Sequence, residues 1–218
     1  VVALMYNDLT LAFWLIVAGI VFDFFDGFVA RLLHSPSAIG VQLDSLADVI
    51  TSGLAPAAVL WQVCLQTEPC WLPETWKLGY GVFVLAAFSA LRLAKFNIDE
   101  TQTVEFCGLP TPAGSLLCAS LGMLWQQGML ALSSDGVLLI AVLTSLLLVS
   151  PIRMFALKFH GFGWRGNEVR YLFLLASIVL IIILRTYAIP VIIVLYIVVS
   201  AVRWLCMHSG NPDKAPKA

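Results

Sequence analysis

Two stretches of the sequence decide how its helices pair: Asp23-Phe-Phe-Asp26-Gly27-Phe-Val-Ala30-Arg31 and Gly40-Val-Gln-Leu-Asp44-Ser-Leu-Ala-Asp48. Asp23 and Asp26 are spaced i, i+3, and Asp44 and Asp48 are spaced i, i+4, so each pair occupies one face of a helix. The segment between the two stretches is short and contains the helix breaker Pro36. We therefore predict an antiparallel pair of helices whose four carboxylates converge at a similar depth.

The composition around these stretches is that of a membrane protein. Of the 218 residues, 61% are apolar and only 11% are charged, and the mean hydropathy is +0.95. A soluble domain carries about 25% charged residues. We therefore predict an all-α fold, a polytopic bundle of transmembrane helices, with the lipid bilayer and no nucleic acid among its partners.

Seven stretches are apolar over enough residues to cross a bilayer, which takes roughly 20 residues in a helix. A tight turn at about 185–190 separates the last two of them. We expect residues 1–208 to form a single transmembrane domain that carries the activity, and residues 209–218 to form a flexible tail. A span before the first residue would make eight in the full protein. The predicted spans are about 9–33, 41–65, 78–97, 111–129, 136–157, 171–184 and 188–207.

The basic residues divide unequally between the two sides that these seven spans define. Ten fall on one side and only Lys77 and Arg185 fall on the other. Because cytoplasmic loops carry an excess of Lys and Arg, the first side is predicted to be cytoplasmic. The rise of about 1.5 Å per residue places the four aspartates roughly 6–16 Å from the loop on this side. They are thus expected inside the membrane boundary, near the cytoplasmic face.

Four ionised carboxylates at that depth require compensation. A single Asp at the centre of a membrane helix costs about 2.5–3.5 kcal/mol on insertion scales, and like charges at close range force some groups to protonate. A divalent cation resolves both problems. Ligation by oxygen alone indicates Mg²⁺, Mn²⁺ or Ca²⁺ rather than zinc, and we expect two ions. The alternative, helix capping or pairing with Arg31, suits Asp44 but not all four aspartates.

Small residues accompany the acidic face. Gly27 and Ala30 would let a bulky ligand approach the helix backbone, and Gly40 opens the second helix, where free N–H groups can bind a phosphate. Ordinary packing of membrane helices is the alternative for each of them. Arg31 either binds a phosphate or reaches the lipid headgroups.

The residues from Asp23 to Asp48 form the pattern D-x2-D-G-x2-A-R-x8-G-x3-D-x3-D, which resembles the signature of the CDP-alcohol phosphatidyltransferase family. The resemblance implies that a CDP-linked lipid binds through its pyrophosphate to metal and that an alcohol displaces CMP. It further implies that Asp23, Asp26 and Asp44 are metal ligands and that Asp48 is the general base while also touching metal. By the same resemblance Gly27, Ala30, Arg31 and Gly40 bind the CDP-lipid, and the protein is a homodimer.

Within that family the chain most resembles the membrane-integral phosphatidylserine synthases, in the segments 46–56, 90–97, 108–113 and 149–158. This likeness implies CDP-diacylglycerol and L-serine as substrates. A cationic side chain should then hold the serine carboxylate, and the candidates are Arg92, Lys95 and Arg153. Lys95 departs from the Arg of the resembled motif, so it keeps the charge but loses the bidentate geometry. Asn97 is expected to be a solvated loop residue.

Other functions remain open at this point. The acceptor alcohol could instead be glycerol 3-phosphate or an inositol phosphate, which would favour a denser basic pocket. Intramembrane carboxylates also mark ion paths, as in a divalent-metal transporter. A transport path should place polar residues on several spans at mid-depth, whereas here the ionisable residues gather on one hairpin. A purely structural role leaves the cost of the four aspartates unexplained.

Overall fold

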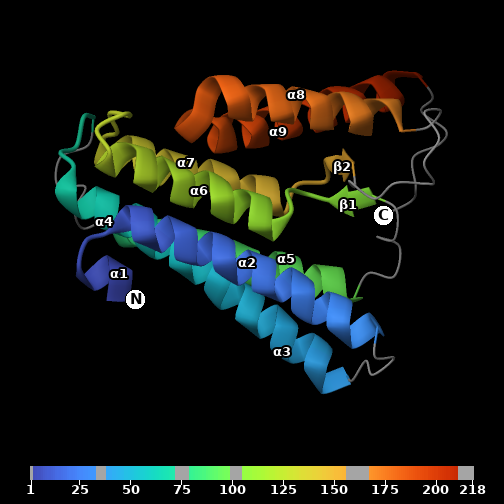
Figure 1. The fold of residues 1–218 in the computed structure, drawn as a ribbon, viewed down its shortest axis with the longest axis horizontal. Coiled ribbons are helices and arrows are strands. Elements are labelled where there is room, and N and C mark those ends of the chain that lie inside the picture. The colour runs from blue at the N-terminus through green and yellow to red at the C-terminus, as the bar shows by residue number, and fades with distance from the viewer. Residues whose placement is uncertain (1, 33–37, 72–78, 99–104, 156–166, 211–218) are drawn as a thin grey trace.

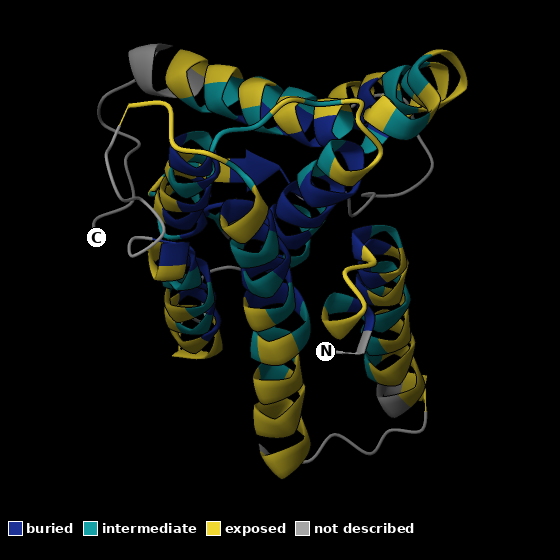
Figure 2. Ribbon diagram, turned by 90° about the vertical axis from the view of Figure 1, so that its left-hand side faces the viewer, coloured by how far each residue is buried: buried dark blue, intermediate teal, exposed yellow. Residues whose placement is uncertain are grey.

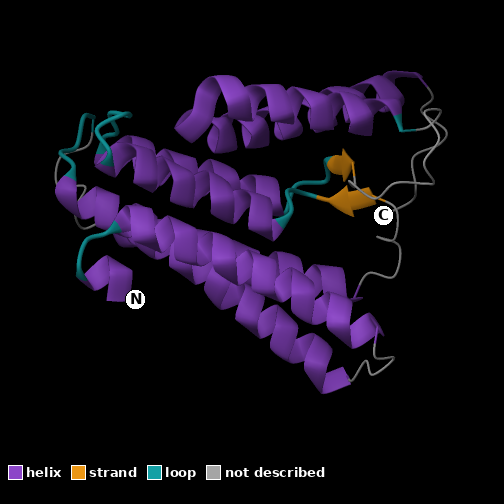
Figure 3. Ribbon diagram, in the orientation of Figure 1, coloured by secondary structure: helices purple, strands orange, loops and turns teal. Residues whose placement is uncertain are grey.

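The long apolar stretches form helices in the computed structural model, which describes residues 2–32, 38–71, 79–98, 105–155 and 167–210. Most of these described residues are helical (Figure 3). The helices are α1 Val2–Met5, α2 Leu9–Leu32, α3 Ala38–Asp48, the π-helical η1 Val49–Leu54, α4 Ala55–Gln66, the 3₁₀-helical η3 Gly79–Phe83, α5 Val84–Ile98, α6 Thr111–Gln126, α7 Ser134–Leu148, α8 Glu168–Leu184, the 3₁₀-helical η4 Arg185–Tyr187 and α9 Ala188–Gly210.

The helices stack in three layers (Figure 1). One layer holds α2, α5 and the continuous run from α3 to α4. Helices α6 and α7 form the middle layer, and the pair α8 and α9 covers its other side. Helix α6 is central, because it packs against α2 and α4 on one side and against α9 on the other.

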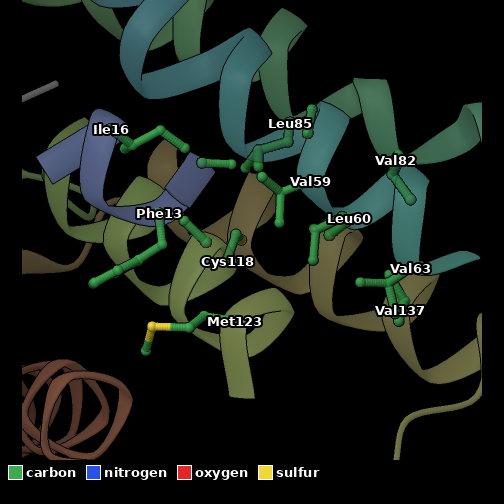
Figure 4. Close-up of a cluster of buried hydrophobic side chains, with 14 of the residues drawn as sticks. Phe13, Ile16, Val59, Leu60, Val63, Val82, Leu85, Cys118, Met123 and Val137 are labelled. Atoms are coloured by element: carbon green, nitrogen blue, oxygen red, sulfur yellow. The ribbon is translucent and has the colours of Figure 1, made fainter. Parts of the chain in front are cut away.

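The core lies where the first and middle layers meet. Phe13 of α2, Leu60 of α4 and Cys118 of α6 are fully buried there (Figure 4). Gly122 of α6 allows this contact, since a Cβ atom at that position would lie 2.3 Å from Cγ1 of Val59. The outer faces are exposed (Figure 2), and their large apolar side chains suit a lipid surrounding.

Exposed phenylalanines gather on the second half of α2, beside the acidic residues. Phe22 and Phe25 are 68% and 53% exposed, and Phe24 and Phe28 are exposed as well. In a soluble protein such a surface would promote association. In a bilayer it is the surface that lipid covers.

Helices α3 and α4 are one continuous run interrupted by the π-helical segment η1, which begins directly after Asp48. π-helical turns are rare and are found mostly at functional sites. Ser52 and Gly53 of this segment are buried, and a Cβ atom on Gly53 would lie 3.0 Å from Cβ of Ser89 on α5. Gly53 therefore lets α5 approach this segment closely, just after the last aspartate.

Two short strands complete the described fold. β1, Glu105–Cys107, pairs antiparallel with β2, Arg153–Phe155. The predicted span over 136–157 was wrong at this end, because α7 ends at Leu148 and Pro151 follows before the strand begins. Met154 and Phe155 are buried in the protein. Hydropathy cannot distinguish a short buried strand from the end of a membrane helix.

Four helical segments are long and apolar enough to cross a membrane: Leu9–Val29, Ile39–Gln66, Gly79–Ile98 and Glu168–Cys206, the last combining α8 and α9. A turn interrupts that last segment at Arg185, which has a φ of 49°, and confirms the predicted separation of the last two stretches. Helices α6 and α7 have 16 and 15 residues, fewer than the roughly 20 that a span takes. The protein is thus an integral membrane protein by its apolar helices, and the count of seven spans stays a prediction.

Candidate active site

Asp23 of α2 lies near Asp44 and Asp48 of α3. Asp23 lies close enough to Asp26, Asp44 and Asp48 for their charges to interact, and its side chain is near that of Asp44. Asp23 and Asp48 are half-buried, whereas Asp26 and Asp44 are exposed. Carboxylates this close repel one another, and a bound cation would offset that repulsion. The hairpin therefore presents a concentrated acidic site, open on one side.

The chemistry of this donor set fits a divalent metal, because carboxylate oxygens are the ligands that Mg²⁺, Mn²⁺ and Ca²⁺ prefer. The contact between Asp23 and Asp44 shows that oxygens from the two helices can reach a common point. In the conformation seen here, no three acidic, His or Cys side chains of the described residues stand close enough to enclose an ion. A metal at this hairpin thus remains a proposal.

The small residues of the hairpin occupy the positions that the sequence suggested. A Cβ atom on Gly27 would meet nothing within 4 Å, so there is open space beside Asp26. Gly40 lies in the first turn of α3, and Ala30 and Arg31 lie near the end of α2. The loop that joins the two helices falls outside the described residues.

Arg92 links the acidic hairpin to the rest of the protein. Its side chain, on α5, is only 8% exposed, and its charge interacts with that of Asp48. Its Nη1 donates a hydrogen bond of 2.6 Å to Oγ1 of Thr111 at the start of α6. The guanidinium also lies 5.9 Å from the ring centroid of Phe96. A cation fixed beside a candidate base is suited to hold an anionic group of a substrate.

A cavity of about 410 Å³ opens beside Arg92. Of the three cations predicted for the acceptor, Arg92 and Lys95 line this cavity together. Arg153 lies on β2 and is exposed, and it is not among the described residues that line the cavity. The lining residues are Arg92, Lys95, Ile98, Cys107, Leu148, Val149, Ser150 and Pro151.

Sequence reasoning missed two residues of this site, Thr111 and Tyr196, and misplaced a third, Asn97. Thr111 is fully buried and is the partner of Arg92. Tyr196 of α9 lies close enough to interact with the charge of Arg92, and its hydroxyl donates to the carbonyl oxygen of Phe155 over 3.0 Å. The sequence did offer one indication of Tyr196, because it is a phenol in an otherwise aliphatic stretch. Asn97 was wrongly expected in a loop, because it belongs to α5 and bonds Ser45 of α3.

Comparison with known proteins finds several similar enzymes. The chain is 33% identical over 159 residues to the CDP-diacylglycerol–serine O-phosphatidyltransferase of Bacillus subtilis, covering 73% of this chain and 82% of that protein. It is 31% identical over 200 residues to the enzyme of the same name from Helicobacter pylori, covering 89% and 80%. It is also 35% identical over 220 residues to the one from Mycobacterium tuberculosis, covering 93% and 73%.

A family model describing CDP-alcohol phosphatidyltransferases matches residues 1–155. The match includes the acidic hairpin, the buried arginine of α5 and the threonine that it bonds. The resemblance inferred from the aspartate pattern is thereby confirmed, and the chain is an enzyme that belongs to the CDP-alcohol phosphatidyltransferase family.

Proposed function

We propose that this protein transfers the phosphatidyl group of CDP-diacylglycerol to the hydroxyl of L-serine, forming phosphatidylserine and CMP. The names of the three relatives support the substrates. The observation that carries the proposal is Arg92, a buried cation that faces Asp48 and borders a cavity. Serine has a hydroxyl and a carboxylate. Asp48 can accept the proton of the hydroxyl, and Arg92 can bind the carboxylate.

The proposed reaction is a single in-line displacement. The serine hydroxyl oxygen forms a bond to the phosphorus next to diacylglycerol, and the bond from that phosphorus to the oxygen of CMP breaks. Asp48 accepts the hydroxyl proton as general base. CMP leaves with the electron pair of the broken bond on its phosphate.

Metal binding is part of the same proposal. Asp23, Asp26 and Asp44, with Asp48 at the edge, would hold one or two Mg²⁺ or Mn²⁺ ions. When bound, such ions supply charge neutralisation for the pyrophosphate of the nucleotide. Gly27, with open space beside it, leaves room for the nucleotide against α2. Arg31 and Gly40 at the loop end of the hairpin are proposed to bind the phosphates, with Ala30 beside them.

The finer topology also remains a proposal. Seven spans would place the acidic hairpin near the cytoplasmic face, because ten of the twelve Lys and Arg residues then lie on that side. Serine and the released CMP are water-soluble, so a site at that depth would exchange them directly with the cytoplasm. The homodimer implied by the family resemblance belongs to the same set of proposals.

One assay tests the reaction. The purified full chain in lipid vesicles receives CDP-diacylglycerol and Mn²⁺ or Mg²⁺, and CMP release is measured with L-serine, glycerol 3-phosphate or an inositol phosphate as the only acceptor. We expect CMP release with serine and phosphatidylserine as the lipid product. Release with glycerol 3-phosphate alone would contradict the choice of acceptor, and no release with any acceptor would contradict the transfer itself. Ping-pong kinetics would contradict the single displacement.

A further inference from the structure

The guanidinium of Arg92 is buried but has unused hydrogen-bonding capacity. A guanidinium carries five N–H donors. One nitrogen, Nη1, bonds Thr111, whereas Nε has no hydrogen-bond partner among the residues that the structure describes. An unpaired donor on a buried cation is costly. Because Arg92 also lines the cavity beside α5, an anionic ligand in that cavity would supply a further partner for the guanidinium.

Thr111 is the residue that fixes the orientation of this guanidinium. It is 0% exposed and is the first residue of α6, between Pro110 and Pro112. Proline locks its own φ angle and restricts the residue before it, so the two prolines hold the backbone on both sides of Thr111. The hydroxyl therefore accepts the bond from Nη1 at a rigid point, 19 residues away from Arg92 along the chain.

The guanidinium has a second neighbour on its own helix. The ring of Phe96 lies on the same helix, 5.9 Å from the guanidinium carbon. With Thr111 holding Nη1 and Asp48 attracting the charge, the side chain has little freedom to turn. Nothing else among the described contacts of Thr111 explains a polar residue with no exposure at this helix start.

We propose that Thr111 is a positioning residue for the acceptor: it orients Arg92 so that the guanidinium binds the carboxylate of the incoming amino alcohol in the cavity between α5, β1 and the end of α7. This inference rests on the proposed function, since it assumes that the acceptor carries a carboxylate. Thr111 itself touches neither substrate. By orienting Arg92, Thr111 strengthens the binding of the acceptor and leaves the binding of the CDP-lipid unchanged.

The test compares Thr111→Val, which keeps the shape and loses the hydroxyl, with Thr111→Ser, which keeps the hydroxyl. In the valine variant we expect the KM for L-serine to rise roughly tenfold, with a smaller change in kcat and an unchanged KM for CDP-diacylglycerol. The serine variant should restore most of the affinity. Thr144→Val is the matched control, because Thr144 is 2% exposed on α7 and its hydroxyl accepts a long hydrogen bond of 3.9 Å from Sγ of Cys118.

A second comparison separates positioning from packing. A lysine at position 92 cannot bind the serine carboxylate in the bidentate way that a guanidinium can. In a chain that already carries Arg92→Lys, Thr111→Val should therefore raise the KM for serine little further. Should the valine variant fail to accumulate, Thr111→Ala is used in its place. An unchanged KM for serine, or equal increases for both substrates, would overturn the inference. A wild-type enzyme that releases no CMP with serine would instead overturn the proposed function.

Discussion

Asn97 of α5 donates a hydrogen bond of 2.8 Å to the hydroxyl of Ser45 on α3. Ser45 directly follows Asp44, and its own hydroxyl donates to the carbonyl oxygen of Val41 over 3.1 Å. The bond joins the helix that carries Arg92 to the helix that carries two of the four aspartates. It therefore fixes the spacing between the proposed acceptor site and the proposed metal site.

This bond should matter for turnover more than for folding. We expect Asn97→Ala and Ser45→Ala each to lower kcat/KM for serine about threefold to tenfold, and the double variant to lose no more than either single one. Initial rates of CMP release measure the effect. Ser177→Ala is the control, since its hydroxyl also bonds a backbone oxygen, that of Phe173, in α8 away from the site. Additive losses in the double variant would show that the two residues act independently.

Asp48→Asn tests the proposed base. The amide keeps the size of the side chain but accepts no proton at this step, so turnover should fall by roughly 10²- to 10⁴-fold. Binding of CDP-diacylglycerol, measured by fluorescence or calorimetry, should remain within a few-fold of wild type. Asp8→Asn is the matched control, because Asp8 accepts from the backbone nitrogen of Leu11 at the other end of α2. Turnover within tenfold of wild type would exclude Asp48 as the base.

Metal removal tests the acidic hairpin as a whole. Chelation with EDTA should stop CMP release, and excess Mg²⁺ or Mn²⁺ should restore it, because the carboxylates then regain a counter-charge that also binds the pyrophosphate. Asp23→Asn should raise the metal concentration needed for half-maximal rate, since Asp23 is in contact with Asp44. Full activity in EDTA would contradict the metal proposal.

Much of the acidic hairpin could be predicted because its information is local. The spacing of Asp23 to Asp26 and of Asp44 to Asp48 sets helix faces, and Pro36 limits where both helices end. The bond between Arg92 and Thr111 could not be predicted in this way, since it joins two helices across a connection whose path the local pattern does not define.

The π-helical segment after Asp48 and the strand β2 escaped prediction for a different reason. A π turn differs from an α turn in hydrogen-bond register, and the run Val49–Leu54 has no residue type that signals it. Met154 and Phe155 are as apolar as the helix before them. Pro151 is a local signal that the helix ends before it, but only tertiary contacts decide that Met154 and Phe155 then pair with β1.

Substitution by alanine should affect protein stability differently at Gly27 and at Gly122. A Cβ atom on Gly27 meets open space, so Gly27→Ala should preserve thermal stability. If the CDP-lipid lies against this backbone, the KM of the Gly27→Ala variant for CDP-diacylglycerol should nevertheless rise several-fold. A Cβ atom on Gly122 would lie 2.3 Å from Val59, so Gly122→Ala should lower the free energy of unfolding by about 1–3 kcal/mol. An unchanged KM in the Gly27 variant would remove this glycine from the lipid site.

Cys70 offers a test of the topology. It is exposed in the segment that follows α4, which seven spans would place on the side opposite the cytoplasm. In intact cells that express the protein, a membrane-impermeant maleimide should therefore label Cys70. Cys70→Ser should remove this signal. Labelling that appears only after permeabilisation would reverse the orientation or change the number of spans before this loop.

The exposed phenylalanines beside the acidic residues of α2 have a consequence for how the enzyme meets its lipid. Phe22 and Phe25, at 68% and 53% exposure, flank a site that handles charged phosphates. A CDP-lipid can then diffuse sideways along the leaflet to the aspartates with its acyl chains still among their neighbours. The quantity that sets the rate of encounter is then the mole fraction of CDP-lipid in the bilayer plane, while serine arrives from the water at its bulk concentration.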